Sequence, residues 1–350
     1  MKDVFAKIAR VVMRWIRVAM RWVRAVIPVA GDSRKEWVRK IAFLTALIVF
    51  IGSGFYLVYE VLIQPYYTQE ITHSMRDLYT DGENAETESK DDPIQQIKVP
   101  EYIAPSFAAL YRRNQDIAGW LKFVATDGST ADDLFGGAID NPVVQSDDNK
   151  YYLNRDYLGE LSRSGTLYFD YRNNLQKLDE ERNVIIYGHN LNSGLMFSRF
   201  NKLVSGKVER ARKLSTVTLD TAYGETAVYK VFAVMIIDVD AKGDAAFDYI
   251  RTQFTKDEQF ETFIEKIRAR SLYDFGDVDV TATDSVLTLS TCSNKRDTTL
   301  KNGRTVIVAR RVRDGESTTV DSSKTVLNDD VLMPKAWYIN KETELPAEYQ

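Results

Sequence analysis

The sequence has few of the side chains that bind metals or form disulfides, with one cysteine and two histidines in 350 residues. A single Cys excludes an intramolecular disulfide and any zinc or iron–sulfur site built from several cysteines. Two histidines, His73 and His189, are too few for a multi-histidine metal site. There is no glycine-rich phosphate-binding loop of either common type, and the acidic residues form no recognisable metal-binding loop. We therefore expect neither a metal nor a cofactor.

The net charge of −4 is small because two unlike segments nearly cancel. Residues 1–40 carry 11 basic and 3 acidic side chains, a net +8, whereas the remainder carries 35 basic and 47 acidic ones, a net −12. Such asymmetry indicates that the basic segment contacts an anionic partner, either a membrane or a nucleic acid.

A long hydrophobic run follows the basic segment. Residues 41–63 are apolar apart from Glu60 and small polar residues, and about 20 such residues span a bilayer as a helix. A buried core helix of this length would have more of a polar face. The positive-inside tendency keeps the basic segment in the cytoplasm, so we expect a single transmembrane helix with residues 64–350 outside. A cleaved signal peptide fits less well, because the run is longer than usual and no cleavage site clearly follows it.

Within residues 1–30 the sequence nearly repeats with a period of seven, since VVMRWIR is followed by VAMRWVR. On a helix the arginines of this repeat share one face and the tryptophans lie near the opposite one. The arginine stripe consists of Arg10, Arg14, Arg17, Arg21 and Arg24. Such a basic amphipathic helix is suited to an anionic membrane surface. The alternative is a coiled-coil or helix-pairing segment, for which the repeat is short. We do not expect nucleic acid as the partner of a stripe beside a bilayer span.

Beyond the membrane the composition changes twice. Residues 64–80 are expected to be either a helical continuation or a stalk. The acidic, proline-containing stretch DGENAETESKDDPIQ that follows is expected to be a linker, so residues 64–100 are assigned as stalk or linker. Residues 101–313 are expected to fold. Residues 314–350 form a polar, weakly patterned tail, and the sequence leaves open whether it packs.

The folding region is mostly strand-like. We expect a short helix over Phe107–Trp120 and a second near Lys256–Arg270, whose apolar residues recur with helical spacing. Apolar runs bounded by Gly, Asn and Asp predict strands at Thr166–Tyr171, Val184–Tyr187, Thr216–Leu219, Ala227–Val239, Val286–Thr291 and Thr305–Val312. About eight short strands with few helices favour a mainly β barrel or sandwich.

Three residues could together carry chemistry. Cys292, the only thiol, ends the alternating run LTLSTC and precedes a polar loop, and His189 follows the apolar run VIIY. A lone cysteine is often a buried core residue, but an unpaired thiol in an extracellular domain is a liability unless it is used. Arg304 opens the strand after the cysteine loop, so it could return towards the same end of the sheet.

These side chains suit acyl transfer through a thioester. A cysteine is an intrinsically strong nucleophile, and a histidine can take up its proton and later protonate a leaving amine. An arginine stays charged and can hold a developing oxyanion or the carbonyls of a substrate. We therefore take Cys292, His189 and Arg304 as the candidate catalytic residues.

The motifs around these residues resemble the sortases, the membrane-anchored cysteine transpeptidases of Gram-positive bacteria. TLSTC at 288–292 resembles the family's TLxTC signature, and YGHN at 187–190 resembles its histidine motif. Arg304 in NGRTVIVAR is placed like the family's essential arginine, and its strand context favours it over Arg296, which lies in the same interval. The resemblance extends over about residues 102–313. The segments that resemble class B in particular are DIAGWLKF (116–123), NPVVQSDDNKYYLN (141–154), GTLYFDYRN (165–173), GLMFSRF (194–200) and the helix near 256–270.

The resemblance implies an eight-stranded sortase-type β-barrel with added helices. It implies that Cys292 attacks the carbonyl of a Thr in a C-terminal sorting motif, of NPxTx type, on a secreted protein. An amine of a peptidoglycan cross-bridge or a pilin Lys then resolves the thioester. His189 acts as acid and then base, while Arg304 positions the substrate and stabilises charge. Thr291 lines the oxyanion region, and Asn154 lines the substrate groove.

Two other interpretations remain at this point. An L,D-transpeptidase is also a β-rich Cys/His acyl-transferase of the cell envelope, but that family places Gly directly before its cysteine, where this chain has Thr291. A non-catalytic, membrane-anchored scaffold module would keep Cys292 merely as a buried residue.

Overall fold

The computed structural model describes residues 13–15, 24–81, 93–125, 139–191, 194–292 and 299–350. The chain divides into two compact units, residues 1–63 and residues 64–350. The first unit contains the long helix α2 (Arg34–Val58), followed by the π-helical segment Tyr59–Ile63.

Helix α2 begins where its sequence supplies a cap. The Ser33 hydroxyl accepts a hydrogen bond from the Glu36 amide, and the Glu36 carboxylate accepts one from the Ser33 amide, which pairs N–H groups that a helix start leaves free. Apolar side chains of α2 are exposed, with Phe50 at 75% and Phe55 at 74%. The helical stretch Arg34–Thr80 is long and apolar enough to cross a membrane, in keeping with the transmembrane helix that the sequence predicts.

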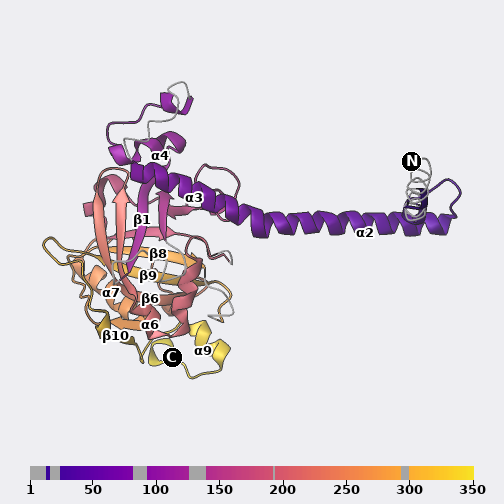
Figure 1. The fold of residues 1–350 in the computed structure, drawn as a ribbon. Coiled ribbons are helices and arrows are strands. Elements are labelled where there is room, and N and C mark those ends of the chain that lie inside the picture. The colour runs from indigo at the N-terminus through magenta and orange to yellow at the C-terminus, as the bar shows by residue number, and fades with distance from the viewer. Residues whose placement is uncertain (1–12, 16–23, 82–92, 126–138, 192–193, 293–298) are drawn as a thin grey trace, which may run out of the picture. The chain divides into compact units, whose positions relative to one another are not determined.

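The second unit is built on a closed β-barrel with helices outside it (Figure 1). Its eight strands are β1 (Ile117–Ala125), β2 (Asp140–Val144), β3 (Leu167–Phe169), β4 (Asn183–Tyr187), β5 (Leu214–Thr221), β6 (Thr226–Asp238), β8 (Val286–Cys292) and β9 (Gly303–Arg311). Around the barrel they follow the order β1-β2-β3-β4-β8-β9-β6-β5. The β2–β3 and β4–β8 pairs are parallel, and the other pairs are antiparallel. The expected eight-stranded barrel is confirmed.

The remaining elements connect or cover the barrel strands. The helices of this unit are α3 (Gln64–Asp81), α4 (Ala108–Arg113), α6 (Val208–Ala211), α7 (Asp257–Arg270) and α9 (Lys335–Lys341). Short 3-10 segments lie at Pro93–Gln96, Pro105–Phe107, Tyr151–Asn154, Leu175–Glu180, Ser198–Ser205, Gly243–Ala245, Ser322–Lys324 and Ala347–Tyr349. Strands β7 (Tyr273–Phe275) and β10 (Thr325–Leu327) pair in a separate two-stranded sheet.

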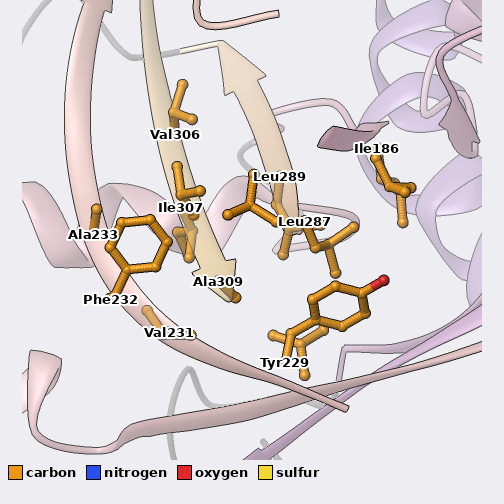
Figure 2. Close-up of a cluster of buried hydrophobic side chains, with 14 of the residues drawn as sticks. Ile186, Tyr229, Val231, Phe232, Ala233, Leu287, Leu289, Val306, Ile307 and Ala309 are labelled. Atoms are coloured by element: carbon orange, nitrogen blue, oxygen red, sulfur yellow. The ribbon is translucent and has the colours of Figure 1, made fainter. Parts of the chain in front are cut away.

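Apolar side chains from neighbouring strands fill the barrel (Figure 2). Leu287 and Leu289 of β8, Ile307 and Ala309 of β9 and Phe232 of β6 are each at most 1% exposed. Burying one large apolar side chain stabilises a fold by about 1.5–3 kcal/mol. The barrel that carries the candidate residues is therefore held by a continuous core.

Helix α7 confirms the helix expected near 256–270. It begins at Asp257, and its residues Phe260, Phe263, Ile264 and Ile267 are buried against the barrel core. Their spacing is the one that places side chains on a single helix face.

The expected helix over Phe107–Trp120 is wrong in its extent. Helix α4 ends at Arg113, and Ile117 already begins β1. The Asn114 side chain accepts a hydrogen bond from the Asp116 amide at 2.9 Å, a local turn that competes with continued helix. The strand then pairs with both β2 and β5, so its conformation is set by partners distant in the sequence.

Residues 64–81, expected to be either a helical continuation or a stalk, form helix α3 and pack on the barrel within the second unit. Met75 is buried, and the Tyr79 ring stacks on Trp120 with centroids 4.4 Å apart. Arg76 forms an ion pair with Asp140 at 3.1 Å. The stalk interpretation overlooked this packing because it relied on composition, whereas α3 buries only one face.

Candidate active site

Three adjacent strands bring the backbones of the candidate residues to one end of the barrel. In the parallel β4–β8 pair Tyr187 is level with Ser290, and the Gly188 amide continues the ladder to the Ser290 carbonyl at 3.1 Å. His189 is the next residue after Gly188. In the antiparallel β8–β9 pair Cys292 lies directly opposite Arg304. Neighbouring strands are about 5 Å apart, so the three residues come from one strand-end region.

The His189 ring is held by a backbone carbonyl. Its Nε2 atom hydrogen-bonds to the Leu153 carbonyl oxygen. Because a carbonyl oxygen only accepts, Nε2 carries the proton, and Nδ1 is the basic nitrogen of the neutral ring. The His189 carbonyl also accepts from the Phe197 amide at 3.1 Å. The half-buried imidazole is thus held at Nε2, which leaves Nδ1 as the ring nitrogen that can exchange a proton with a bound group.

Two glycines allow the chain to approach His189 closely. Gly165 has φ +58°, and a Cβ added there would lie 2.8 Å from the Leu153 carbonyl oxygen and 2.9 Å from His189 Cδ2. A Cβ on Gly188 would lie 2.5 Å from Leu167 Cδ2. A larger residue at Gly165 would collide with the backbone that orients the imidazole, whereas one at Gly188 would displace the Leu167 and Phe197 side chains.

A buried carboxylate fixes the end of β4 just before His189. Asp170 is 0% exposed, and it accepts hydrogen bonds from Arg172 Nε at 2.8 Å, the Tyr187 hydroxyl at 2.8 Å and Asn149 Nδ2 at 3.0 Å. Burial raises the pKa of Asp170, but the bonds from Arg172 and Tyr187 outweigh it, so the net pKa is lowered. Burial, together with the Asp170 charge, raises the pKa of Tyr187. The carboxylate therefore stays charged and the hydroxyl stays a donor.

Thr291, next to Cys292 in the chain, has a buried and unpaired hydroxyl. The residue is 2% exposed, and its Oγ1 has no hydrogen-bond partner among the residues that the structure describes. By contrast, Thr288 Oγ1 donates to Asn183 Oδ1 at 2.7 Å, and Ser290 Oγ lies 3.0 Å from the Tyr249 hydroxyl. A buried hydroxyl without a partner is destabilising. Of the three hydroxyl side chains in β8, the one without a described partner belongs to the residue before Cys292.

The other candidates occupy less constrained positions. Arg304 is half-buried, and its Nη1 donates to the Gly303 carbonyl at 3.0 Å. No carboxylate in the described part of the chain forms an ion pair with it. Asn154 is exposed and ends the 3-10 segment whose Leu153 holds His189. Arg296 lies outside the described residues.

Sequence reasoning missed the residues that hold the imidazole. Gly165 and Asp170 fall within the class B-like stretch GTLYFDYRN, and Tyr187 within the histidine motif YGHN, but only His189 was assigned a role there. The signal available in the sequence was a glycine and an aspartate in GTLYFDYRN and a tyrosine two residues before the candidate histidine. The Leu153 carbonyl could not be foreseen, because a backbone contact carries no side-chain signature.

Comparison with known proteins gives consistent matches. A sequence model described as the Sortase domain matches residues 137–312. A sortase B of Listeria monocytogenes is 31% identical over 278 residues, which covers 79% of this chain and 98% of that protein. A sortase B of Staphylococcus aureus is 31% identical over 216 residues, covering 62% of this chain and 78% of that protein.

Solved structures agree with the sequence matches. The crystal structure of sortase B from Bacillus anthracis in complex with AAEK1 superposes with a TM-score of 0.55 and 29% identity. The superposition covers 72% of this chain and 100% of that one. The residues matched by the Sortase model include 154, 189, 291, 292 and 304.

Proposed function

This chain belongs to the sortase family of cysteine transpeptidases, in its class B, and on that premise we propose the reaction that it performs. It cleaves a C-terminal sorting motif in a secreted protein and joins the new Thr carboxyl to an amine of peptidoglycan or of a pilin. The family match disfavours an L,D-transpeptidase and a non-catalytic scaffold.

The proposed chemistry has two acyl transfers. His189 takes the proton of the Cys292 thiol, and the sulfur attacks the Thr carbonyl carbon. The Thr–x amide bond breaks as His189 passes this proton to the departing amine, which leaves a thioester. The acceptor amine then attacks the thioester and gives its proton to His189, a new amide bond forms, and the Cys292 sulfur leaves and recovers the proton from His189. Arg304 stabilises the negative charge on the carbonyl oxygen in both steps.

One observation carries this assignment: Cys292 and Arg304 are paired directly across β8 and β9, and His189 follows the parallel neighbour β4 at the same end. His189 Nδ1 and the Arg304 guanidinium have no carboxylate partner among the described residues, which supports the same roles. Two further supports are the buried Thr291 hydroxyl, which has no partner in the described part of the chain and belongs to the residue before Cys292, and the exposed Asn154 beside Leu153 as a groove residue.

Intact-mass spectrometry of the protein with a panel of sorting-motif peptides, including Asn-Pro-x-Thr-x, tests the proposal. We expect a covalent adduct with the mass of the peptide up to its Thr, lost on addition of an amine acceptor. Glycine peptides and a lysine peptide as acceptors separate wall from pilin attachment. Cys292→Ala should form no adduct, because it lacks the sulfur, and His189→Ala should form it far more slowly. Transpeptidation retained by Cys292→Ala would falsify the mechanism.

We also propose that the N-terminus lies in the cytoplasm, with α2 as the membrane anchor, and that the arginine stripe binds anionic lipid. The stripe falls largely outside the described residues, but residues 13–15 and 24–26 are helical, and Trp15 is 69% exposed. Replacing Arg14, Arg17, Arg21 and Arg24 by Gln in a peptide of residues 1–30 should weaken its binding to vesicles containing phosphatidylserine, with neutral vesicles as control. Unchanged binding would mean that the stripe serves another partner.

A further inference from the structure

The C-terminal segment, residues 314–350, lies beyond the residues that match the Sortase model and is fastened to the outside of the barrel unit. Its strand β10 pairs with β7. Beyond this strand, Asn328 Nδ2 donates to the Ser271 carbonyl at 2.8 Å, and the Leu332 amide donates to the Ala269 carbonyl at 2.8 Å. The segment is therefore anchored where α7 ends and β7 begins.

From this anchor the segment reaches the chain that leads into Arg304. Met333 packs in a small buried cluster with Leu300 and with Ile236 of β6, and the three are 6%, 1% and 3% exposed. Asn340 Nδ2 donates a hydrogen bond to the Thr299 carbonyl oxygen at 2.8 Å. One apolar and one polar contact thus join the C-terminal segment to residues 299–300.

The backbone at Thr299 needs such support. Its φ is +61°, in the left-handed region that a β-branched side chain rarely adopts. Its Oγ1 is buried and has no hydrogen-bond partner in the described part of the chain. A residue in this conformation persists only when its surroundings hold it there. The contacts that Met333 and Asn340 make with residues 299–300 are that support.

We propose that Met333 and Asn340 are positioning residues for Arg304, so that the C-terminal segment holds this arginine in place for the transpeptidation proposed above, on which the inference rests. Three residues separate Leu300 from Arg304. Between them Asn302 is held by the end of β6 and the residues after it, since its Nδ2 donates to Asp240 Oδ2 at 2.7 Å and its carbonyl accepts from the Val239 amide at 3.3 Å. Strand β9 then begins at Gly303, opposite Asp238 of β6. The Arg304 guanidinium itself bonds only to the adjacent Gly303 carbonyl among the described residues, so its position follows from the backbone that carries it.

Asn340→Ala in the full chain, solubilised in detergent, tests the polar contact. We expect the single-turnover rate of acylation by an Asn-Pro-x-Thr-x peptide to fall about fivefold, as for a lost hydrogen bond. The rate of Cys292 alkylation by iodoacetamide should stay unchanged, because that reaction does not use Arg304. The matched control is Ile339→Ala, which removes a neighbouring side chain that is 59% exposed, and it should acylate at the parental rate. An unchanged acylation rate in Asn340→Ala, or an equal fall in acylation and alkylation, overturns the proposal.

Two further measurements separate positioning from general support of the fold. In an Arg304→Lys background, Asn340→Ala should lower the acylation rate by a much smaller factor than in the parent, since both changes act through the same side chain. If Asn340→Ala lowers the rate by the same factor in both backgrounds, the proposal is contradicted. Met333→Leu should retain the acylation rate that Met333→Ala lowers, because the leucine still fills the contact with Leu300. Equal rates for the two Met333 variants also contradict it.

Hydrogen exchange without peptide makes the inference testable apart from the proposed function. Asn340→Ala should raise exchange of the backbone over residues 299–304 and leave exchange in β4 unchanged. If the parent protein forms no acyl-enzyme with any peptide, the proposed function has failed, while the exchange result still decides whether the segment holds this backbone. Unchanged exchange over 299–304 overturns the positioning role.

Discussion

Arg304 and Arg310 lie on the same strand, β9, at the two ends of its pairing with β8. Arg304 is opposite Cys292, and Arg310 is opposite Val286. Arg304 is half-buried and bonds to a neighbouring backbone carbonyl. Arg310 is 0% exposed, and its donors are engaged by Glu316 and by the Asp279 and Arg311 carbonyls. An arginine with engaged donors holds the fold, whereas one with free donors can bind a substrate.

The Arg310 end is a charge network. Glu316 accepts from both Arg310 and Lys230, the latter at 2.7 Å. Arg313 bonds to Asp284 at 2.6 Å. The hydrogen bond from Arg310 is the main cause that holds the pKa of Glu316 well below its usual range, with Lys230 adding to it against the effect of burial. The Glu316 carboxylate compensates the buried Arg310 guanidinium, which would otherwise be strongly destabilising.

The largest expected difference between the two ends is in catalysis. Arg304→Ala should lower kcat/KM for transpeptidation about 10²- to 10³-fold, as for the loss of a charge that stabilises an oxyanion. Its thermal unfolding midpoint should stay near the parental value, because no described carboxylate is left unpaired. Peptide turnover and thermal unfolding of the full chain in detergent measure the two effects. A large loss of stability with little loss of turnover would reverse the assignments of the two arginines.

The sequence predicted the strands that carry the candidate residues better than the path of the chain around them. The alternating run ending at Cys292 identified β8, and the apolar run Thr305–Val312 identified β9, because such runs are local signals. The pairing of β4 with β8 joins residues about 100 positions apart, which no local pattern encodes. The strand count favoured a barrel or a sandwich, and the family resemblance implied the barrel. Strand β1 was mistaken for helix because its conformation depends on β2 and β5.

The C-terminal segment shows the same limit. The tail 314–350 is polar and weakly patterned as a whole, so the sequence left open whether its apolar stretch around Met333 packs. Its partners, Leu300 and Ile236, come from the loop before β9 and from β6. Likewise, nothing local distinguishes Arg304 from Arg310, since both are basic residues in an apolar strand. What separates them is Glu316, which returns to Arg310 after the strand has ended.

Loss of the buried ion pair between Arg310 and Glu316 should have a smaller effect, and this effect should be on stability and not on catalysis. Glu316→Gln should lower the free energy of unfolding at pH 7 by about 2–3 kcal/mol, because it leaves the buried Arg310 charge poorly compensated. The turnover of the folded enzyme should be unchanged. The matched control is Glu180→Gln, which breaks the pair with Lys177 at 2.9 Å, where both side chains are largely exposed; exposed pairs contribute under about 1 kcal/mol. Denaturant unfolding measures both, and equal losses would show that burial does not distinguish these pairs.

The difference in unfolding free energy between the parent and Glu316→Gln should also become smaller at acidic pH. A carboxyl whose pKa is lowered on folding adds stability above its unfolded value, near 4.5, and loses that contribution as the pH falls towards the folded value. The parent should therefore lose stability more steeply than Glu316→Gln below about pH 4.5, while the other carboxyls titrate alike in both. Unfolding free energies between pH 7 and pH 3 measure the narrowing, and a constant difference would contradict the lowered pKa. The difference in unfolding free energy between the parent and Arg304→Ala should stay constant over this pH range, since no described carboxylate pairs with Arg304. A similar decrease there would mean that a carboxylate compensates the charge of Arg304 as well as that of Arg310.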